Sequence, residues 1–205
     1  MALPTPIYDL WQFPDVYEPS QDSHLFLDAL EKDREEIVSR HPTLALEIGS
    51  GSGILITALG TILQSSCACF STDINFSACQ ATKKTSLLNK VSIESLAMNL
   101  TDMFKCCFDV VLFNPPYVVT ESGEVSGRGL NRAFAGGLKG RLIIDKFLEV
   151  VPKVLSEKGV CYLLLLKEND IKEVVKNLEK AGLKGELVIQ RKLPGEHLFV
   201  YKFCR

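Results

Sequence analysis

The chain has 205 residues, of which 46% are hydrophobic and 23% charged, and its net charge is −2. This composition is that of a globular protein, so it excludes a disordered chain, and the length suits one domain with a sizeable core. The slightly acidic balance, with a pI near 6.0, argues against a general attraction to nucleic acid.

Seven cysteines form neither a Cys-x-x-Cys pair nor a His-spaced cluster. An odd number without such a framework indicates reduced thiols, and we predict no metal site. The first six residues lack the charged and apolar regions of a signal peptide, and the longest apolar run, Val160–Leu166, is too short to cross a bilayer. We therefore expect a soluble protein of the cytoplasm, with the nucleus as a second location.

A polar, proline-punctuated stretch, Val16–Ser23, leads into the first predicted helix. Asp22 or Ser23 is placed to cap this helix, and apolar residues from Leu25 to Ile37 form a rough helical stripe. Capping is the simpler interpretation of these two polar residues. A lid over a neighbouring ligand is the alternative, which the capping pattern alone does not support.

Thr43–Ile48 predicts the first core strand, followed by the loop Gly49–Gly53 and a helix to about Leu63. Glycines at 49, 51 and 53 let the backbone approach a ligand, with free N–H groups at the helix N-terminus. The dinucleotide fingerprint is incomplete because position 54 is Ile, and no Gly-Lys-Ser/Thr follows, which excludes a P-loop. Glu47, inside the strand end, would repel a pyrophosphate but suit an amino acid's ammonium group, which favours S-adenosylmethionine as the ligand.

Cys67–Thr72 predicts the second strand, which ends in Asp73. An acidic residue about twenty positions after a glycine loop is well placed for two ribose hydroxyls. The alternative role for Asp73 is to cap the helix predicted over Asn75–Asn89. Val91–Met98 predicts a third strand that ends at Asn99-Leu100.

The run Asp109–Phe113 predicts a buried strand, and Asn114-Pro115-Pro116-Tyr117 follows directly. The prolines make a stiff turn without N–H donors. The side-chain carbonyl of Asn114 and the backbone carbonyl of Pro115 can together accept both hydrogens of a planar –NH2 group, against the flat ring of Tyr117. This clamp suits alkylation of an amide or aromatic amine; the alternative is an ordinary Asn-Pro-Pro loop.

Four polar residues thus follow four successive strands: Glu47, Asp73, Asn99 and Asn114. Ligands bind outside the carboxyl ends of the strands in open α/β sheets, so we expect these residues to converge.

After Tyr117 comes a glycine-rich loop of about twenty residues, which we expect to form the lip of a substrate groove. The rest of the chain predicts a helix that begins near Arg141 and meets Pro152, a strand over Val160–Leu166, a helix over Asp170–Ala181 and two closing strands. We find no internal repeat or second domain.

Read together, these motifs resemble the class-I S-adenosylmethionine-dependent methyltransferases. More narrowly, the chain resembles the eukaryotic and archaeal branch of the HemK family, which methylates the glutamine of the Gly-Gly-Gln motif in translation release factors. The resemblance rests on five stretches: Val16–Pro19 with Asp22-Ser23, Leu46–Gly53, Thr72–Asn75, Phe113–Val119, and Ala135–Gly137 with Gly140-Arg141.

The resemblance implies a Rossmann-like α/β fold with helices on both faces of a seven-stranded, mostly parallel sheet whose last strand is antiparallel. We expect a single methyltransferase domain over 1–205, with an N-terminal lid segment and helix over 1–40 and a catalytic core over 41–205.

By the same resemblance, the cofactor site comprises Tyr17, Ser23, Glu47, Gly49, Gly51, Asp73, Asn99, Leu100 and Asn114. Glu47 and Gly49 would face the methionine part, Asp73 the ribose, and Asn99-Leu100 the adenine, while Tyr17 and Ser23 close over the ligand. Asn114, Pro115 and Tyr117 would be catalytic, and with Pro116 would bind the glutamine amide. The family usually has Asp where this chain has Asn99, so that amide must be held in one orientation.

The resemblance also implies a small zinc-binding activator subunit, which strand addition along Val91–Met98 would accommodate. Three alternatives remain open: an adenine-amino methyltransferase acting on DNA or RNA, a histone-lysine methyltransferase, and a catalytically idle binding subunit. We assign no catalytic base, and we expect surface or packing roles for His24, His41 and His197.

Overall fold

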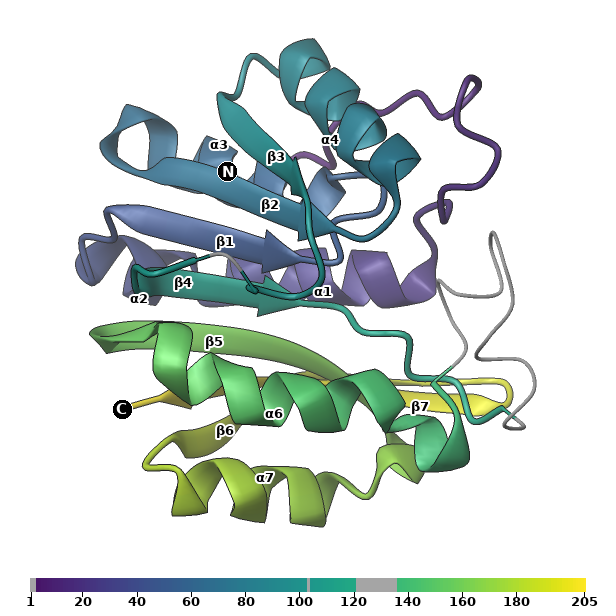
Figure 1. Ribbon diagram of the computed structural model, residues 1–205, viewed down its shortest axis with the longest axis vertical. Coiled ribbons are helices and arrows are strands. Elements are labelled where there is room, and N and C mark those ends of the chain that lie inside the picture. Colours follow the sequence, from purple (N-terminus) through teal and green to yellow (C-terminus); the bar gives the residue numbers. More distant parts are fainter. Residues whose placement is uncertain (1–2, 103, 121–135) are drawn as a thin grey trace.

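The computed structural model describes residues 3–102, 104–120 and 136–205. Its centre is a seven-stranded sheet in the order β3-β2-β1-β4-β5-β7-β6 (Figure 1). The strands are β1 (Leu44–Ile48), β2 (Ala68–Asp73), β3 (Ile93–Ala97), β4 (Phe108–Phe113), β5 (Leu155–Leu166), β6 (Lys184–Leu193) and β7 (Glu196–Cys204).

Strands β1 to β5 pair in parallel, whereas β7 runs antiparallel between β5 and β6. The tight turn at Gly195 explains this arrangement, because a short hairpin can join only antiparallel neighbours. The predicted Rossmann-like fold with an antiparallel last strand is thus confirmed.

Six α-helices are found in the described residues: α1 (Gln21–Lys32), α2 (Arg34–Ser39), α3 (Ile54–Leu63), α4 (Phe76–Leu88), α6 (Leu142–Val154) and α7 (Ile171–Lys180). Helices α1 to α3 lie behind the sheet in Figure 1, and α6 and α7 lie in front of it. Helix α4 packs against β2 and β3 at one edge. None of the helices in the described ranges has the length and apolar character needed to cross a bilayer.

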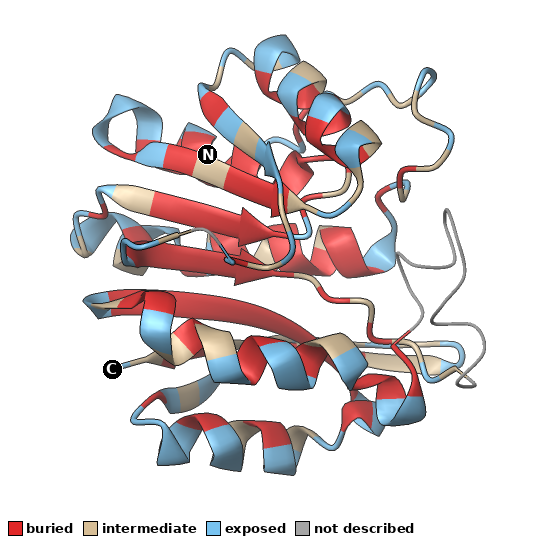
Figure 2. Cartoon of the chain, viewed as in Figure 1, coloured by how far each residue is buried: buried red, intermediate tan, exposed pale blue. Residues whose placement is uncertain are grey.

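The core lies along the central strands, which Figure 2 shows as almost continuously buried. Every residue of β4 is buried, as expected for a strand covered on both faces. At its carboxyl end, the ring of Phe113 packs against that of Phe147 from α6, with centroids 4.6 Å apart. The end of β4 is therefore held rigidly.

Two local predictions need correction. Helix α1 begins at Gln21 with Ser20 as its N-cap, so Asp22 and Ser23 do not cap it and instead lie buried in its first turn. Helix α6 does not stop at Pro152 but continues to Val154. Pro152 lacks the N–H that would donate to the Leu148 carbonyl, so the helix loses one hydrogen bond there and ends within the same turn.

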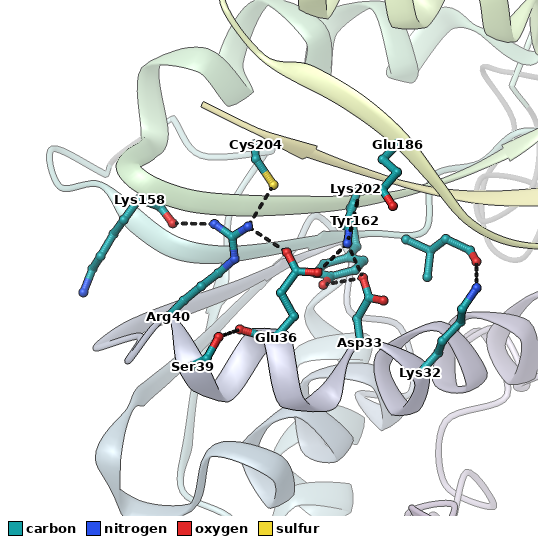
Figure 3. A network of polar contacts seen from close by, with 11 residues as sticks. Lys32, Asp33, Glu36, Ser39, Arg40, Lys158, Tyr162, Glu186, Lys202 and Cys204 are labelled. Carbon is teal, nitrogen blue, oxygen red and sulfur yellow. Dashed lines mark hydrogen bonds and ion pairs between the residues drawn. The ribbon is translucent and has the colours of Figure 1, made fainter.

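An ion network fastens the junction of α1 and α2 to β7 (Figure 3). Lys202 of β7, only 7% exposed, pairs with Asp33 at 3.2 Å and with Glu36 at 2.5 Å. The Tyr162 hydroxyl donates to the same Asp33 carboxylate, and Arg40 pairs with Glu36. Because α1 begins at the carboxyl ends of the strands, this network anchors the far end of the helix that enters the site.

Candidate active site

A cavity of about 770 Å³ opens at the carboxyl ends of β1 to β4. Its volume lies within the range typical of sites for small ligands. All twelve residues predicted from the sequence line it: Tyr17, Ser23, Glu47, Gly49, Gly51, Asp73, Asn99, Leu100, Asn114, Pro115, Pro116 and Tyr117. The convergence expected from the strand ends is therefore present in the structure.

The glycine loop forms the floor of this cavity. Gly49, Gly51 and Gly53 all have left-handed backbone, with φ of 65°, 51° and 78°. A side chain at Gly53 would also bring its Cβ within 2.6 Å of the Thr82 backbone in α4. All three positions favour glycine for φ, and Gly53 also needs it for the close approach of α4.

Asp73 fixes the loop at the end of β2. One carboxylate oxygen accepts the Gly51 N–H at 3.0 Å, and the other accepts the Asn75 N–H at 2.8 Å. Asn75, and not Asp73, caps α4, since its side chain accepts the Ser77 N–H. Burial raises the pKa of Asp73. Each oxygen of this carboxylate keeps acceptor capacity for a hydroxyl of a ligand.

Glu47 is a buried carboxylate at the end of β1, 2% exposed. Burial, and then the charge of Asp73, raise its pKa well above the ordinary value, although the Ile56 N–H donates to it at 2.9 Å. Among the described residues no cation is among the groups that shift this pKa, so a cationic ligand group would be favoured here because it offsets the cost of ionisation.

Asn99 and Leu100 follow β3 at the cavity's edge. The Asn99 side-chain Nδ2 donates to Asp102 at 3.3 Å, so its carbonyl oxygen is the group left to accept. Both side chains are exposed, so this contact favours the orientation that Asn in place of Asp requires without burying it. The Leu100 carbonyl accepts the Thr72 hydroxyl at 2.8 Å, which ties this turn to β2.

Asn114 presents the acceptor that the sequence predicted. Its Nδ2 donates to Asp22 at 2.9 Å, whereas its Oδ1 is buried and has no partner among the described residues. A buried carbonyl without a donor is unfavourable, so the site is complete only when a ligand N–H or O–H reaches it.

The Tyr117 turn is supported from behind by Asn169. This fully buried side chain donates from Nδ2 to the Tyr117 and Lys139 carbonyls, both at 2.9 Å, and accepts the Leu166 N–H at 2.7 Å. Gly140 packs so closely that a Cβ there would meet the Tyr117 carbonyl. These contacts position the Pro-Pro-Tyr backbone from the side opposite the cavity.

Sequence reasoning missed two residues of this arrangement. Asp22 lines the cavity; the sequence offered it as a helix cap or as part of a lid over a ligand, and neither interpretation predicted its contact with Asn114. Asn169 had none, because it lies 52 residues from Tyr117. The predicted lip of the groove falls largely on residues 121–135, outside the described residues.

The N-terminal segment reaches the cavity along α4 (Figure 1). Asp9 pairs with Lys84 at 2.7 Å, and buried Val16 packs against Ala78 and Ala81. Tyr17 therefore enters the cavity from a segment held by α4 and not from the core. In the part of the chain that the structure describes, no cluster of His, Cys, Asp and Glu side chains is arranged to hold a metal ion.

Comparison with known proteins shows the family. Residues 18–181 match the family described as Methyltransferase small domain. The methyltransferase HEMK2 of Homo sapiens is 38% identical over 200 residues, covering 94% of this chain and 91% of the relative. A putative protein N5-glutamine methyltransferase of Methanocaldococcus jannaschii is 35% identical over 192 residues, covering 94% and 93%.

Among solved structures, the Mtq2–Trm112 complex of E. cuniculi, described as responsible for methylation of the termination factor eRF1, has a chain that superposes with a TM-score of 0.70. That chain is 27% identical, and the match covers 93% of this chain and 99% of the other. Together with the acidic, glycine-lined cavity at the strand ends, these matches establish that the chain belongs to the HemK family of class-I S-adenosylmethionine-dependent methyltransferases.

Proposed function

We propose that this enzyme methylates the side-chain amide nitrogen of the glutamine in the Gly-Gly-Gln motif of a class-I translation release factor. The observation that carries the proposal is the unpartnered, buried Oδ1 of Asn114 in the cofactor cavity. The described activities of the relatives, methylation of eRF1 and of protein glutamine N5, support the same substrate.

The cofactor residues are proposed as follows. Glu47 and the Gly49 and Gly51 backbone would hold the methionine part, Asp73 the ribose hydroxyls, and Asn99 with Leu100 the adenine. Tyr17 and Ser23 would close over the bound molecule. When bound, S-adenosylmethionine supplies an electrophilic methyl group on a sulfonium sulfur.

The chain's contribution to catalysis is positioning. Asn114 Oδ1 and the Pro115 carbonyl accept the two N–H groups of the glutamine amide, and the Tyr117 ring holds the amide plane. This clamp directs the nitrogen along the transfer line and stabilises positive charge that develops on it. With the cofactor bound, the held nitrogen would accept the methyl group as its bond to sulfur breaks, and would then release one proton to water.

Positioning of this kind can lower a barrier by about 7–11 kcal/mol, so a dedicated base is not required. Consistent with this, none of the three histidines lines the cavity. A lysine amine would first have to lose a proton and would use two carbonyl acceptors less well, which ranks the histone-lysine alternative below the amide.

The test is methyl transfer from isotopically labelled cofactor to a purified Gly-Gly-Gln release factor, with the Gln→Ala factor, a histone and oligonucleotides as competing substrates. We expect label only in the intact release factor, located at the glutamine by mass spectrometry. Label in the oligonucleotides or histone, with none in the release factor, would contradict the proposal that the release factor is the substrate.

We also propose a small zinc-binding activator subunit that adds to the free edge of β3. Among the described strands, β3 pairs with β2 alone, and its Leu96 is 37% exposed. The neighbouring helix α4 adds the exposed side chains Phe76, Leu87 and Leu88. An open strand edge beside apolar side chains suits strand addition, and the related E. cuniculi protein forms a complex with Trm112.

A further inference from the structure

We infer that Asp22 is a positioning residue of the reaction, because its carboxylate selects the amide orientation in which Asn114 accepts a hydrogen bond from the substrate. The inference rests on the proposed function, since it takes Asn114 to be the group that holds the substrate nitrogen. Asp22 lies in the first turn of α1, 92 positions before Asn114, and both line the same cavity.

The two ends of the Asn114 amide group meet different surroundings. An asparagine amide can turn so that its oxygen and nitrogen exchange places, and only the surrounding hydrogen bonds decide between the two orientations. Here Nδ2 lies 2.9 Å from Asp22 Oδ2, and Oδ1 is buried without a partner among the described residues.

The reversed orientation is unfavourable on both sides. It would place Oδ1 against a carboxylate oxygen, so that two acceptors face each other. It would also turn the amide NH2 of Asn114 toward the NH2 of the substrate, so that two donors face each other. A carboxylate at position 22 therefore excludes the orientation that cannot bind an amide substrate.

Asp22 is itself held in place by two neutral donors. The Tyr17 hydroxyl donates to Oδ1 at 3.1 Å and the Ser23 hydroxyl at 3.3 Å, and Asp22 is only 4% exposed. Burial, followed by the charge of Asp22, raises the pKa of Tyr17, so this hydroxyl keeps its proton as a donor. The carboxylate thus accepts on both oxygens, with Oδ2 directed at Asn114.

The carboxylate also strengthens the acceptor that it orients. A hydrogen bond from an amide N–H to an ionised acceptor draws electron density toward the amide oxygen, and bonds in such a chain reinforce one another. Asn114 Oδ1 consequently becomes a better acceptor as the substrate nitrogen gains positive charge. Asp22 acts on the reaction through Asn114 and needs no contact with the substrate.

The first test is side-chain amide NMR of 15N-labelled enzyme with S-adenosylhomocysteine, the resonance of Asn114 being assigned by its loss in Asn114→Ala. We expect one Nδ2 proton shifted strongly downfield by the carboxylate, and we expect this shift to disappear in Asp22→Asn. A wild-type resonance at ordinary amide positions, or one that Asp22→Asn leaves unchanged, would overturn the inference. The wild-type spectrum decides even if the variant fails to fold.

The second test is steady-state kinetics on the release factor. Asn at position 22 can face Asn114 with either end, so both orientations become populated and we expect kcat of Asp22→Asn to fall at least tenfold. Cofactor affinity and thermal stability should change far less. Tyr17→Phe, which removes one of two donors to Asp22, should lower kcat by a smaller factor.

The matched control is Asp28→Asn, the same substitution on the same helix. Asp28 pairs with Arg191 away from the cavity, so this variant should keep the wild-type kcat. Equal losses in both variants, or a loss at Asp22 that parallels cofactor affinity, would indicate a structural role only. If the wild type methylates no release factor, the proposed function fails, while the NMR test still decides the orientation of Asn114.

Discussion

At the scale of single residues, two asparagines of this cavity are oriented by aspartates. Asp102 accepts from Asn99 and Asp22 accepts from Asn114, so in each amide the oxygen is the group left to accept. The cavity thus combines a buried carboxylate at β1 and a half-buried one at β2 with neutral acceptors after β3 and β4. The carboxylates suit the cationic group of the proposed cofactor, and the neutral acceptors suit the amino groups of adenine and of the substrate amide.

The first prediction separates substrate binding from cofactor binding. Asn114→Ala should lower turnover by about 10²–10³-fold, as does removal of one preorganised group that stabilises transition-state charge, while cofactor affinity changes little. Asp73→Ala should instead weaken cofactor binding. Single-turnover rates and calorimetric titration measure the two effects. Equal losses of cofactor affinity in both variants would contradict this division of roles.

The second prediction concerns the pH dependence of Glu47. Its pKa is raised in the folded chain, so its contribution to stability is complete below the ordinary value of 4.5 and is lost as pH rises through the raised value. The free enzyme should therefore lose stability over this range, and Glu47→Gln should lose less.

Cofactor binding gives the matching measurement for Glu47. A cationic ammonium beside the carboxylate favours ionisation, so binding should release a proton and tighten as pH rises. Calorimetry in two buffers of different ionisation enthalpy measures the proton count. Proton uptake by the wild type, or an unchanged proton count in Glu47→Gln, would show that another group is responsible.

At the scale of elements, the site is assembled from three independent supports. Strand β4 is fixed by the core, the Tyr117 turn is held by Asn169, and helix α1 brings in Asp22. Because α1 is tied to β7 by the network around Lys202, the position of Asp22 depends on contacts at the other end of the helix.

The third prediction tests this anchor. Lys202→Met leaves the Asp33 carboxylate without its cationic partner, with the Tyr162 hydroxyl still donating to it. The free energy of unfolding should therefore fall by about 2 kcal/mol, below the roughly 3–5 kcal/mol of a fully buried pair. Urea unfolding measures the change. Glu186→Gln is the control, because its 3.6 Å contact with Lys202 comes from a largely exposed side chain and should contribute less than about 1 kcal/mol. Equal losses would contradict the anchor.

At the scale of the whole molecule, the two outer strands of the sheet formed by the described residues have different surroundings. Edge strand β3 borders the cofactor cavity through Met98 and Asn99, whereas β6 lies at the far edge beside α7. A subunit bound at β3 would therefore contact the adenine side of the site, which gives a physical route to activation.

The fourth prediction compares these edges. Leu96→Lys on β3 should abolish binding of the activator subunit, because it places a charge on the edge that the partner must cover. Leu187→Lys on β6 is the matched control, since both leucines are 37% exposed on edge strands. Co-purification and calorimetry measure binding. Loss of binding with Leu187→Lys alone would place the partner at the opposite edge.

The sequence by itself determined the helices and strands, and it determined that the site lies at the carboxyl ends of the strands. Buried runs ending in Glu47, Asp73 and Asn114 predict parallel strands, and parallel strands must bring their carboxyl ends together. The twelve cavity residues follow from this rule and from the family motifs. Turn chemistry after β4 also predicted that Asn114 lies at the strand end as a candidate acceptor, because two prolines leave the backbone little freedom.

Only the tertiary structure decided which polar groups meet across long sequence separations. Hydrophobic periodicity assigns a residue to an element and a face, but it carries no information on the partner of a buried polar side chain. Asp22 was expected to cap a helix or to belong to a lid, and it meets Asn114; Asn169 supports Tyr117 from the short 3-10 helix Lys167–Asn169 after β5. Such pairs form because the packed interior leaves no water to satisfy them, so each buried polar group must bond to whatever neighbour the fold supplies.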